Sequence, residues 1–143
     1  MNDIENIARN ISLETFENFD ISRFINDNAY MLKEFIGYFY ESHKDINRVW
    51  NLNNWDVSKI TDMSYLFYNL QSIEALFIDN WNVSNVVNMN FMFYNCKCLR
   101  YVDISKWDIS NVVNNKQYMF NHCDKLQLNE RMKYYVTVNN ILY

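Results

Sequence analysis

The chain has 143 residues, of which half are hydrophobic and 17% are aromatic, and its formal net charge is −4. This apolar content excludes an intrinsically disordered chain, because it supplies enough hydrophobic surface to offset the entropy of ordering. The length predicts one domain, with or without an arm. The acidity and the scattered lysines and arginines argue against nucleic acid as a partner, since nucleic-acid binders carry a basic face.

The residue usage is biased toward asparagine, isoleucine and tyrosine, with one glycine and no proline. Turns must therefore rely on Asn, Asp and Ser. The excess of asparagine, isoleucine and tyrosine also fits an AT-rich genome. We expect no signal peptide and no membrane insertion, because no basic leader and no run of ~20 apolar residues is found. Three cysteines, Cys96, Cys98 and Cys123, predict free thiols in a reducing compartment. We therefore expect an intracellular protein, acting in the cytoplasm or, for a viral protein, in the host cytoplasm or the virion.

Two helical pieces are predicted before the main body of the chain. Residues 1–28 form a helical arm, in which isoleucines share one helical face and Ser12 caps a second short helix. This arm either packs on the next helix or serves as a docking arm. That next helix, at 29–45, is an N-terminal cap whose apolar residues recur at helical spacing: Ala29, Leu32, Phe35, Ile36 and Phe39.

A 26-residue repeat dominates the rest of the sequence. Trp55, Trp81 and Trp107 are each 26 residues apart and open the phrases WDVSKITDM, WNVSNVVNM and WDISNVVNN. A unit of this size cannot bury its own apolar side, so neighbouring units must stack and share one core. Equivalent positions then form ladders along the axis, of which two are aromatic: Trp55, Trp81 and Trp107, and Phe67, Phe93 and Phe120.

Each repeat is predicted to carry a short strand and a short helix. Alternating apolar residues predict strands before the tryptophans, at 76–78 and 101–104. One- to two-turn helices are expected after each phrase, at 63–69, 89–95 and 117–122. Repeats then occupy about 46–126. A C-terminal cap at 127–143 ends the solenoid, and alternation from Met132 to Val138 predicts an edge strand there.

The phrases WDVSKITDMSYLF, FYNCKCL and VDISKW resemble the BspA-like, mycoplasma-lipoprotein type of 26-residue leucine-rich-like repeat, over about residues 29–128. The resemblance implies an α/β repeat solenoid: a short, leucine-rich-repeat-like, right-handed solenoid of about three coils with an N-terminal helical cap. It also implies an adhesion or protein-interaction module without catalytic residues. The chain departs from surface members of the family in showing no export signal and only about three coils. These features and the AT-type composition point to a large DNA virus as the source.

Catalytic motifs and cofactor sites are not expected. The chain has two histidines, His43 and His122, and no HExxH, GxSxG or P-loop motif. Three thiols and an imidazole are ligands that structural zinc uses, but Cys96 and Cys123 fall at the repeat position held by Leu70. We interpret them as inert core thiols. A Cys96–Cys123 disulfide is geometrically feasible under oxidising conditions.

Three hypotheses for function follow. The first is a non-catalytic protein–protein interaction module, whose aromatic contact residues either bind a partner or only shield the core edge. The second is a self-assembling structural, virion-associated protein that uses the exposed end strand and the tail at 141–143. The third, an enzyme or metal protein, depends only on the Cys/His set. The candidate contact residues of the first hypothesis are Tyr65, Tyr68, Phe91, Tyr94, Tyr101 and Tyr118.

Overall fold

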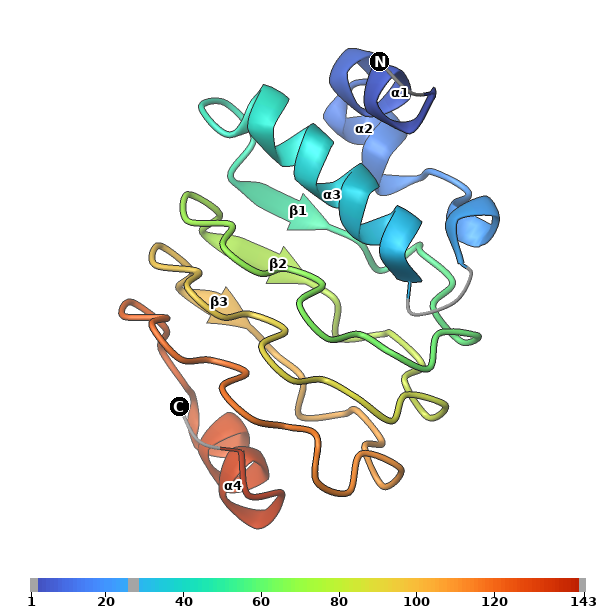
Figure 1. Cartoon of the computed structure of the whole chain (residues 1–143). Coiled ribbons are helices and arrows are strands. Elements are labelled where there is room, and N and C mark those ends of the chain that lie inside the picture. The colour runs from blue at the N-terminus through green and yellow to red at the C-terminus, as the bar shows by residue number, and fades with distance from the viewer. Residues whose placement is uncertain (1–2, 26–28, 142–143) are drawn as a thin grey trace.

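Helices lie at the two ends of the chain in the computed structural model, which describes residues 3–25 and 29–141 (Figure 1). A three-stranded sheet lies between them. Within the described residues, no helix has the length and apolarity needed to cross a membrane. The elements are α1 (Asp3–Asn10), α2 (Leu13–Glu17), the 3-10 helix η1 (Ile21–Phe24), α3 (Tyr30–His43), β1 (Val49–Asn51), β2 (Ala75–Phe77), β3 (Tyr101–Val102) and α4 (Glu130–Val138).

The sheet is parallel and open, with strand order β1-β2-β3. Val49 pairs with Ala75, and Ala75 pairs with Tyr101, so each strand is 26 residues from its neighbour. The 26-residue period of the sequence therefore sets the register of the sheet. We use this register to define three equivalent segments: the first at 49–74, the second at 75–100 and the third at 101–127.

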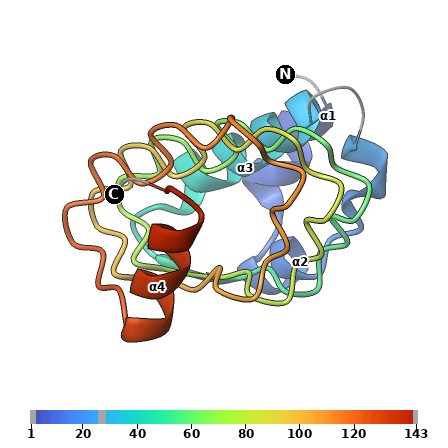
Figure 2. The same ribbon diagram turned by 90° about the horizontal axis from the view of Figure 1, so that it is seen from below.

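A second row of backbone hydrogen bonds joins the same segments after the sheet. Phe67 N–H donates to the Met92 carbonyl at 2.8 Å, and Phe93 N–H donates to the Met119 carbonyl at 2.9 Å. Seen from below, the segments superimpose on one oval outline, with α4 across its near end (Figure 2). Each segment is thus fixed to the next at two places, and the buried side chains fill the interior.

Two stacks of aromatic rings run through this interior. Trp81 lies 6.5 Å from Trp55 and 6.1 Å from Trp107, with nearly parallel rings. The indole Nε1 of Trp81 donates to the Leu52 carbonyl at 2.8 Å, and Trp107 donates to the corresponding carbonyl one segment later. For Trp55 the acceptor is the Phe16 carbonyl, at 3.0 Å. The end of α2 therefore takes the place that a preceding segment would hold.

The second stack is made of phenylalanines. Phe93 lies 5.6 Å from Phe67 and 4.9 Å from Phe120, with ring planes within 15° of parallel. All three rings are buried. Offset stacking of this kind adds to the stabilisation that burial provides, by about 0.5–1.5 kcal/mol per pair.

The N-terminal residues pack on α3 and on the first segment. Phe16 is fully buried and stacks on Phe39, with ring centroids 3.8 Å apart. The edges of Trp50 and Trp55 approach the same ring at 4.9 and 5.1 Å. Of the two arrangements open to this arm, the structure shows the packed one.

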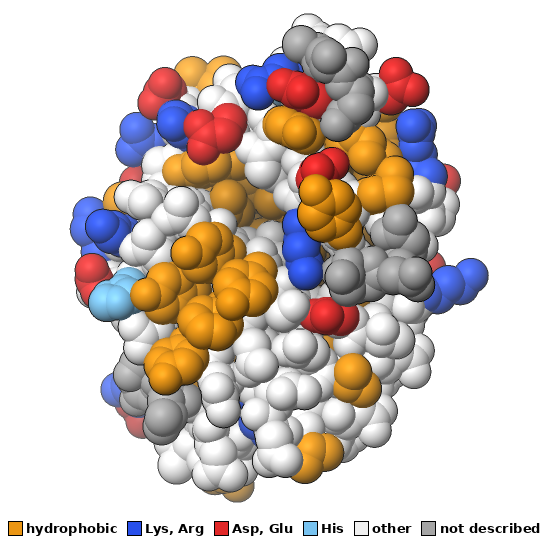
Figure 3. All heavy atoms as spheres, viewed as in Figure 1, with side chains coloured by type: hydrophobic (Ala, Val, Ile, Leu, Met, Phe, Trp, Pro, Cys, Tyr) orange, Lys and Arg blue, Asp and Glu red, His pale blue; other side chains and the backbone are white. Residues whose placement is uncertain are grey.

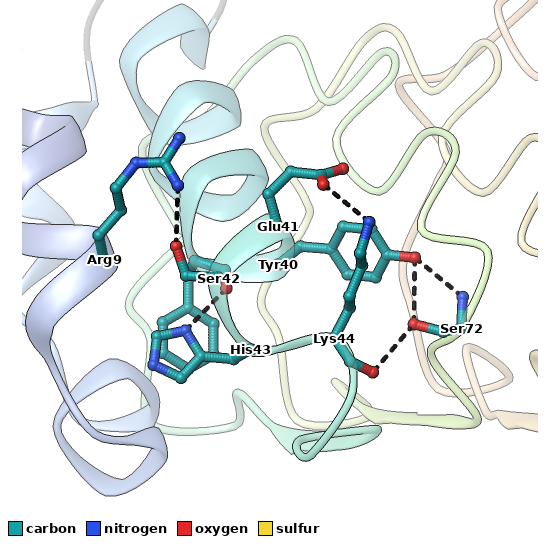
Figure 4. A network of polar contacts seen from close by, with 8 residues as sticks. Arg9, Tyr40, Glu41, Ser42, His43, Lys44 and Ser72 are labelled. Carbon is teal, nitrogen blue, oxygen red and sulfur yellow. Dashed lines mark hydrogen bonds and ion pairs between the residues drawn. The ribbon is translucent and has the colours of Figure 1, made fainter.

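Polar contacts hold the C-terminal end of α3 between α1 and the first segment (Figure 4). Arg9 from α1 donates to the Ser42 hydroxyl at 3.1 Å. The backbone N–H of Ser72 donates to the Tyr40 hydroxyl at 3.0 Å. His43 stacks on the Phe39 ring, and its Nδ1 lies 2.9 Å from the Phe39 carbonyl. The position of α3 is therefore fixed on both sides.

The predicted fold class, an α/β repeat solenoid, is wrong. The architecture is a small domain with four α-helices and an open three-stranded parallel sheet. The helices expected at 63–69, 89–95 and 117–122 are turns. Left-handed residues such as Tyr65 and Asn69 interrupt a right-handed helix, and their N–H groups donate to the next segment instead.

The predicted C-terminal edge strand is also wrong, because α4 occupies that part of the chain. Asn129 caps the helix by accepting a hydrogen bond from the Met132 N–H at 2.9 Å. Met132 and Val136 are the buried residues of the helix. A spacing of four satisfies both an alternating pattern and a helical one, so alternation alone misled the prediction. Of the predicted self-pairing tail, Leu142 and Tyr143 lie outside the described residues.

Asp103 ties α4 to the third segment and makes stability depend on pH. Its carboxylate accepts hydrogen bonds from Ser105 and pairs with Arg131 at 2.6 Å. Burial alone would raise the pKa of Asp103, but the Ser105 hydrogen bonds and the Arg131 charge outweigh it and hold the pKa below its usual value. Because the folded-state pKa is depressed, ionised Asp103 stabilises the folded state. This stabilisation is complete above the unfolded-state pKa of about 3.9 and is lost as the pH falls through the folded-state pKa.

We therefore expect Asp103→Asn to lower the free energy of unfolding by about 1–2 kcal/mol at pH 7 and by less at pH 3. Urea unfolding at the two pH values measures this. Glu130→Gln, at an exposed carboxylate paired with Lys133, is the matched control and should have little effect at either pH. If the free energy of unfolding of Asp103→Asn fell between pH 7 and pH 3 by as much as that of the wild type, the role assigned to Asp103 would be contradicted.

Candidate interaction surface

A group of hydrophobic side chains gathers on the face of the molecule shown in Figure 3. The rings of five predicted contact residues touch one another across the three segments. We call this set the aromatic patch; its members are Tyr65, Tyr68, Phe91, Tyr94 and Tyr118.

The rings of the aromatic patch form two columns. In the first, Phe91 lies 4.9 Å from Tyr65 and 5.1 Å from Tyr118. In the second, Tyr68 and Tyr94 are 5.5 Å apart and nearly parallel. The columns meet edge to face, at 5.3 Å in the first segment and 5.4 Å in the second. The backbone register between segments thus produces a regular array of rings.

The aromatic patch is open to solvent. Tyr65, Tyr68 and Tyr118 expose 46%, 43% and 51% of their surface, and Phe91 and Tyr94 are half-buried. Single exposed apolar residues are ordinary on protein surfaces, whereas contiguous apolar patches mark interaction sites. The aromatic patch is therefore a contiguous surface rather than a set of scattered exposed residues.

The first column occupies backbone positions that disfavour aromatic residues. Tyr65, Phe91 and Tyr118 have φ values of 61°, 59° and 57°. The left-handed conformation costs about 1–2 kcal/mol for most L-residues, and asparagine tolerates it better. The same turns contain a second left-handed position, where the sequence places asparagine in two of the three turns, at Asn69 and Asn95, and His122 in the third. The aromatic residues are thus retained at a conformational cost.

A hollow lies at each end of the aromatic patch. The first, of about 440 Å³, borders Tyr68 and is lined by residues of α1 and α3. The second, of about 500 Å³, borders Tyr118. The rings therefore lie between two recesses. The first recess is lined by Arg9, Glu34, Gly37, Tyr38, Tyr40, Glu41, Tyr68, Asn69 and Leu70, and the second by Val113, Asn114, Lys116, Gln117, Tyr118, Asn121 and Asn140.

The sixth predicted contact residue, Tyr101, lies elsewhere. It belongs to β3, and its ring packs 5.1 Å from Phe77 of β2. Within the described part of the chain it contacts no ring of the aromatic patch. The sequence shows that Tyr101 is outside the ladders, but it does not show which surface the residue faces.

Sequence reasoning missed one neighbour of the aromatic patch, His122. Its ring meets Tyr94 edge to face at 5.3 Å, and its φ of 63° places it at the repeat position of Asn69 and Asn95. That repeat position was visible in the sequence, and it was the signal that would have placed His122 beside the tyrosines. The α3 residues in the first recess, such as Tyr38, had no such signal, because α3 is outside the repeats.

Cys96 and Cys123 hold equivalent positions in neighbouring segments. Cys96 is buried, and its thiol donates to the Phe67 carbonyl at 3.1 Å; Cys123 is partly exposed and donates to the Phe93 carbonyl at 3.0 Å. Among the described residues, no three metal-ligating side chains come together. The thiols form a stacked pair, as their shared repeat position predicts.

Comparisons with known proteins identify a family. A family model described as "Mycoplasma protein of unknown function, DUF285" matches residues 30–141, from the start of α3 to beyond α4. No curated protein and no solved structure matches the chain. The match covers every residue of the aromatic patch and confirms the resemblance to the BspA-like family. The chain therefore belongs to the family of mycoplasma proteins described as DUF285.

Proposed function

We propose that this chain is a non-catalytic protein–protein interaction module and that the aromatic patch is its contact surface. The observation that carries the proposal is the first column, where three aromatic residues hold left-handed positions on the surface. Backbone strain at an exposed position supports a functional role when the same turn elsewhere carries a residue suited to the conformation. Asn69 and Asn95 supply that comparison.

The energetics of the column favour retention for binding over retention for stability. At Phe91, stacking on its two neighbours contributes about 0.5–1.5 kcal/mol per pair, or about 1–3 kcal/mol together, and the left-handed backbone costs about 1–2 kcal/mol. These two contributions nearly cancel, so the Phe91 ring adds little to folding. Tyrosines that hold a fixed position before binding lose little entropy on contact, and they are enriched among binding hot spots.

The shape of the surface indicates what a partner must present. The stacked rings offer flat apolar faces, and the tyrosine hydroxyls offer hydrogen-bonding groups at the same surface. A partner with apolar side chains spaced to reach the two recesses would bury the patch and fill both hollows. We therefore propose a protein partner that contacts the rings with an apolar surface and forms hydrogen bonds with the tyrosine hydroxyls.

The proposed place of action is a reducing compartment, in the cytoplasm of a cell or of a host. The three unpaired thiols support this. A large-DNA-virus source, with the chain in the host cytoplasm or the virion, is proposed on the small number of repeats, the expected absence of an export signal and the AT-type composition. Mass spectrometry of purified virions and infected cells tests the viral source. The chain should be found in infected cells, in their cytoplasm or in the virions, and be absent from uninfected cells.

Site-specific photo-crosslinking tests the proposed function. Benzoylphenylalanine replaces Tyr65 in one variant and Tyr101, an exposed aromatic outside the aromatic patch, in a matched control. After irradiation in an extract of the native source, we expect discrete protein adducts from position 65 that are absent from position 101. Tyr68→Ser in the position-65 variant should reduce their yield, because it removes a neighbouring ring.

Adducts that are the same from both positions, or that persist unchanged with Tyr68→Ser, would contradict the proposal. An adduct at twice the chain mass would identify a second copy as the occupant. Such self-association would use the aromatic patch rather than the predicted end strand, because α4 occupies the residues expected to form that strand.

A further inference from the structure

The thiols of Cys96 and Cys123 are stacked in neighbouring segments and form a pair. They hold equivalent positions, directly after the turns at 90–95 and 117–122, and the Asn95 N–H joins the two turns by donating to the Asn121 carbonyl at 2.9 Å. Each thiol points toward the preceding segment, with Cys96 Sγ 3.1 Å from the Phe67 carbonyl and Cys123 Sγ 3.0 Å from the Phe93 carbonyl.

The two thiols differ in access and in acidity. Cys96 is fully buried, whereas Cys123 is partly exposed. The neighbouring Cys123 thiol, and burial, raise the pKa of Cys96. The neighbouring Cys96 thiol lowers the pKa of Cys123, although burial opposes this. One member of the pair is therefore an accessible thiol with increased thiolate character, and the other is held behind it in the core.

We propose that Cys96 and Cys123 are a dithiol modification site that reacts with peroxides and closes to a disulfide. Cys123 is the attacking thiol, and Cys96 is the resolving thiol. This role is separate from partner binding by the aromatic patch and does not depend on it.

The chemistry proceeds in two steps. The Cys123 thiolate attacks one oxygen of hydrogen peroxide; an S–O bond forms, the O–O bond breaks, and hydroxide leaves and takes up a proton to become water. The product is a sulfenic acid. The Cys96 sulfur then attacks the Cys123 sulfur; the S–S bond forms, the S–O bond breaks, and a second water leaves. In total, two thiols lose two hydrogen atoms and one peroxide is reduced to two waters.

The backbone permits this closure. Equivalent residues of paired parallel segments lie at separations within the range of Cα distances that disulfides span. To form the disulfide, both sulfurs must leave their carbonyl acceptors, and rotation of the two side chains brings this about. Closure links the second segment covalently to the third beneath the turns that carry Tyr94 and His122.

Peptide mapping after peroxide treatment tests the proposal on the wild-type chain. Lys97 lies between Cys96 and Cys98, so trypsin separates these two cysteines and distinguishes the possible pairings. We expect loss of two of the three thiols, a linked peptide that joins Cys96 to Cys123, and recovery of both thiols with a reductant. A linkage through Cys98, or a disulfide between two molecules, would overturn the assignment.

Three variants separate the roles. Cys98→Ser is the control and should lose both remaining thiols together. Cys98→Ser with Cys123→Ser should lose its Cys96 thiol at least about tenfold more slowly, because the buried thiol lacks access and thiolate character. Cys98→Ser with Cys96→Ala should stop at a Cys123 sulfenic acid that dimedone traps. Equal thiol loss with and without Cys123, or no dimedone adduct, would overturn the proposal; the wild-type map decides the matter should a variant fail to fold.

Discussion

Phe16→Ala should lower the free energy of unfolding by about 3–5 kcal/mol. Phe16 is completely buried and lies in ring contact with Phe39, Trp50 and Trp55. Its removal leaves a cavity at the centre of the contact between α2, α3 and the first segment. Urea unfolding followed by tryptophan fluorescence measures the change, because two of the affected rings are tryptophans.

Phe19→Ala is the matched control for this substitution. Phe19 is only partly buried and contacts Phe24 and Phe35, but no tryptophan. We expect a loss of about 1–2 kcal/mol, since an incompletely buried ring contributes less. Equal losses for the two variants would contradict the central position assigned to Phe16. A Phe16→Ala chain as stable as the wild type would show that the N-terminal residues are not part of the folded unit.

The second large effect is expected at the phenylalanine stack. Phe93→Ala should cost about 3–5 kcal/mol, because Phe93 is fully buried between Phe67 and Phe120. Chemical denaturation measures it. Phe91→Ala, two residues earlier, removes the same side chain from the surface column and should cost about 1–3 kcal/mol through the loss of two stacking contacts.

The comparison of these two variants separates the interior from the aromatic patch. Phe91 and Phe93 belong to the same turn, and their N–H groups make equivalent hydrogen bonds to the third segment. A Phe91→Ala loss as large as that of Phe93→Ala would mean that the surface column is a structural part of the core. The proposal that the aromatic patch serves binding would then lose its main support.

Much of the internal order was predictable from the repeat. The 26-residue spacing of Trp55, Trp81 and Trp107 indicated which residues would stack, and the structure places their rings 6.1–6.5 Å apart. The predicted strands at 76–78 and 101–104 lie within two residues of β2 and β3. Periodicity predicts such positions well because equivalent residues must share a register.

The local conformation inside each repeat was not predictable from periodicity. The sequence around Tyr65 has the apolar spacing of a short helix, but its backbone is left-handed at Tyr65 and Asn69. Asn69 was a signal for this conformation, because asparagine tolerates the left-handed region. Tyr65 was not, because tyrosine rarely adopts it. The stabilising hydrogen bonds come from the next segment, 25 residues away along the chain, so no local pattern reports them.

The candidate surface was predictable in part for the same reason. The repeat indicated that the five residues of the aromatic patch lie outside the core ladders, and stacking brought their rings together. The side on which Tyr101 lies depends on the path of each segment around the core. The recess next to Tyr68 depends on how α3 packs. Both are tertiary features without a short-range sequence signal.

Phe91→Gly provides the most direct test of the account, when its stability and its partner binding are measured on the same preparation. Glycine relieves the left-handed strain, worth about 1–2 kcal/mol, and removes two stacking contacts of about 0.5–1.5 kcal/mol each. We therefore predict a free energy of unfolding within about 1 kcal/mol of the wild type and affinity for the crosslinked partner reduced at least about tenfold. A chain that loses several kcal/mol of stability while its affinity is unchanged would contradict the central claim that these rings serve recognition.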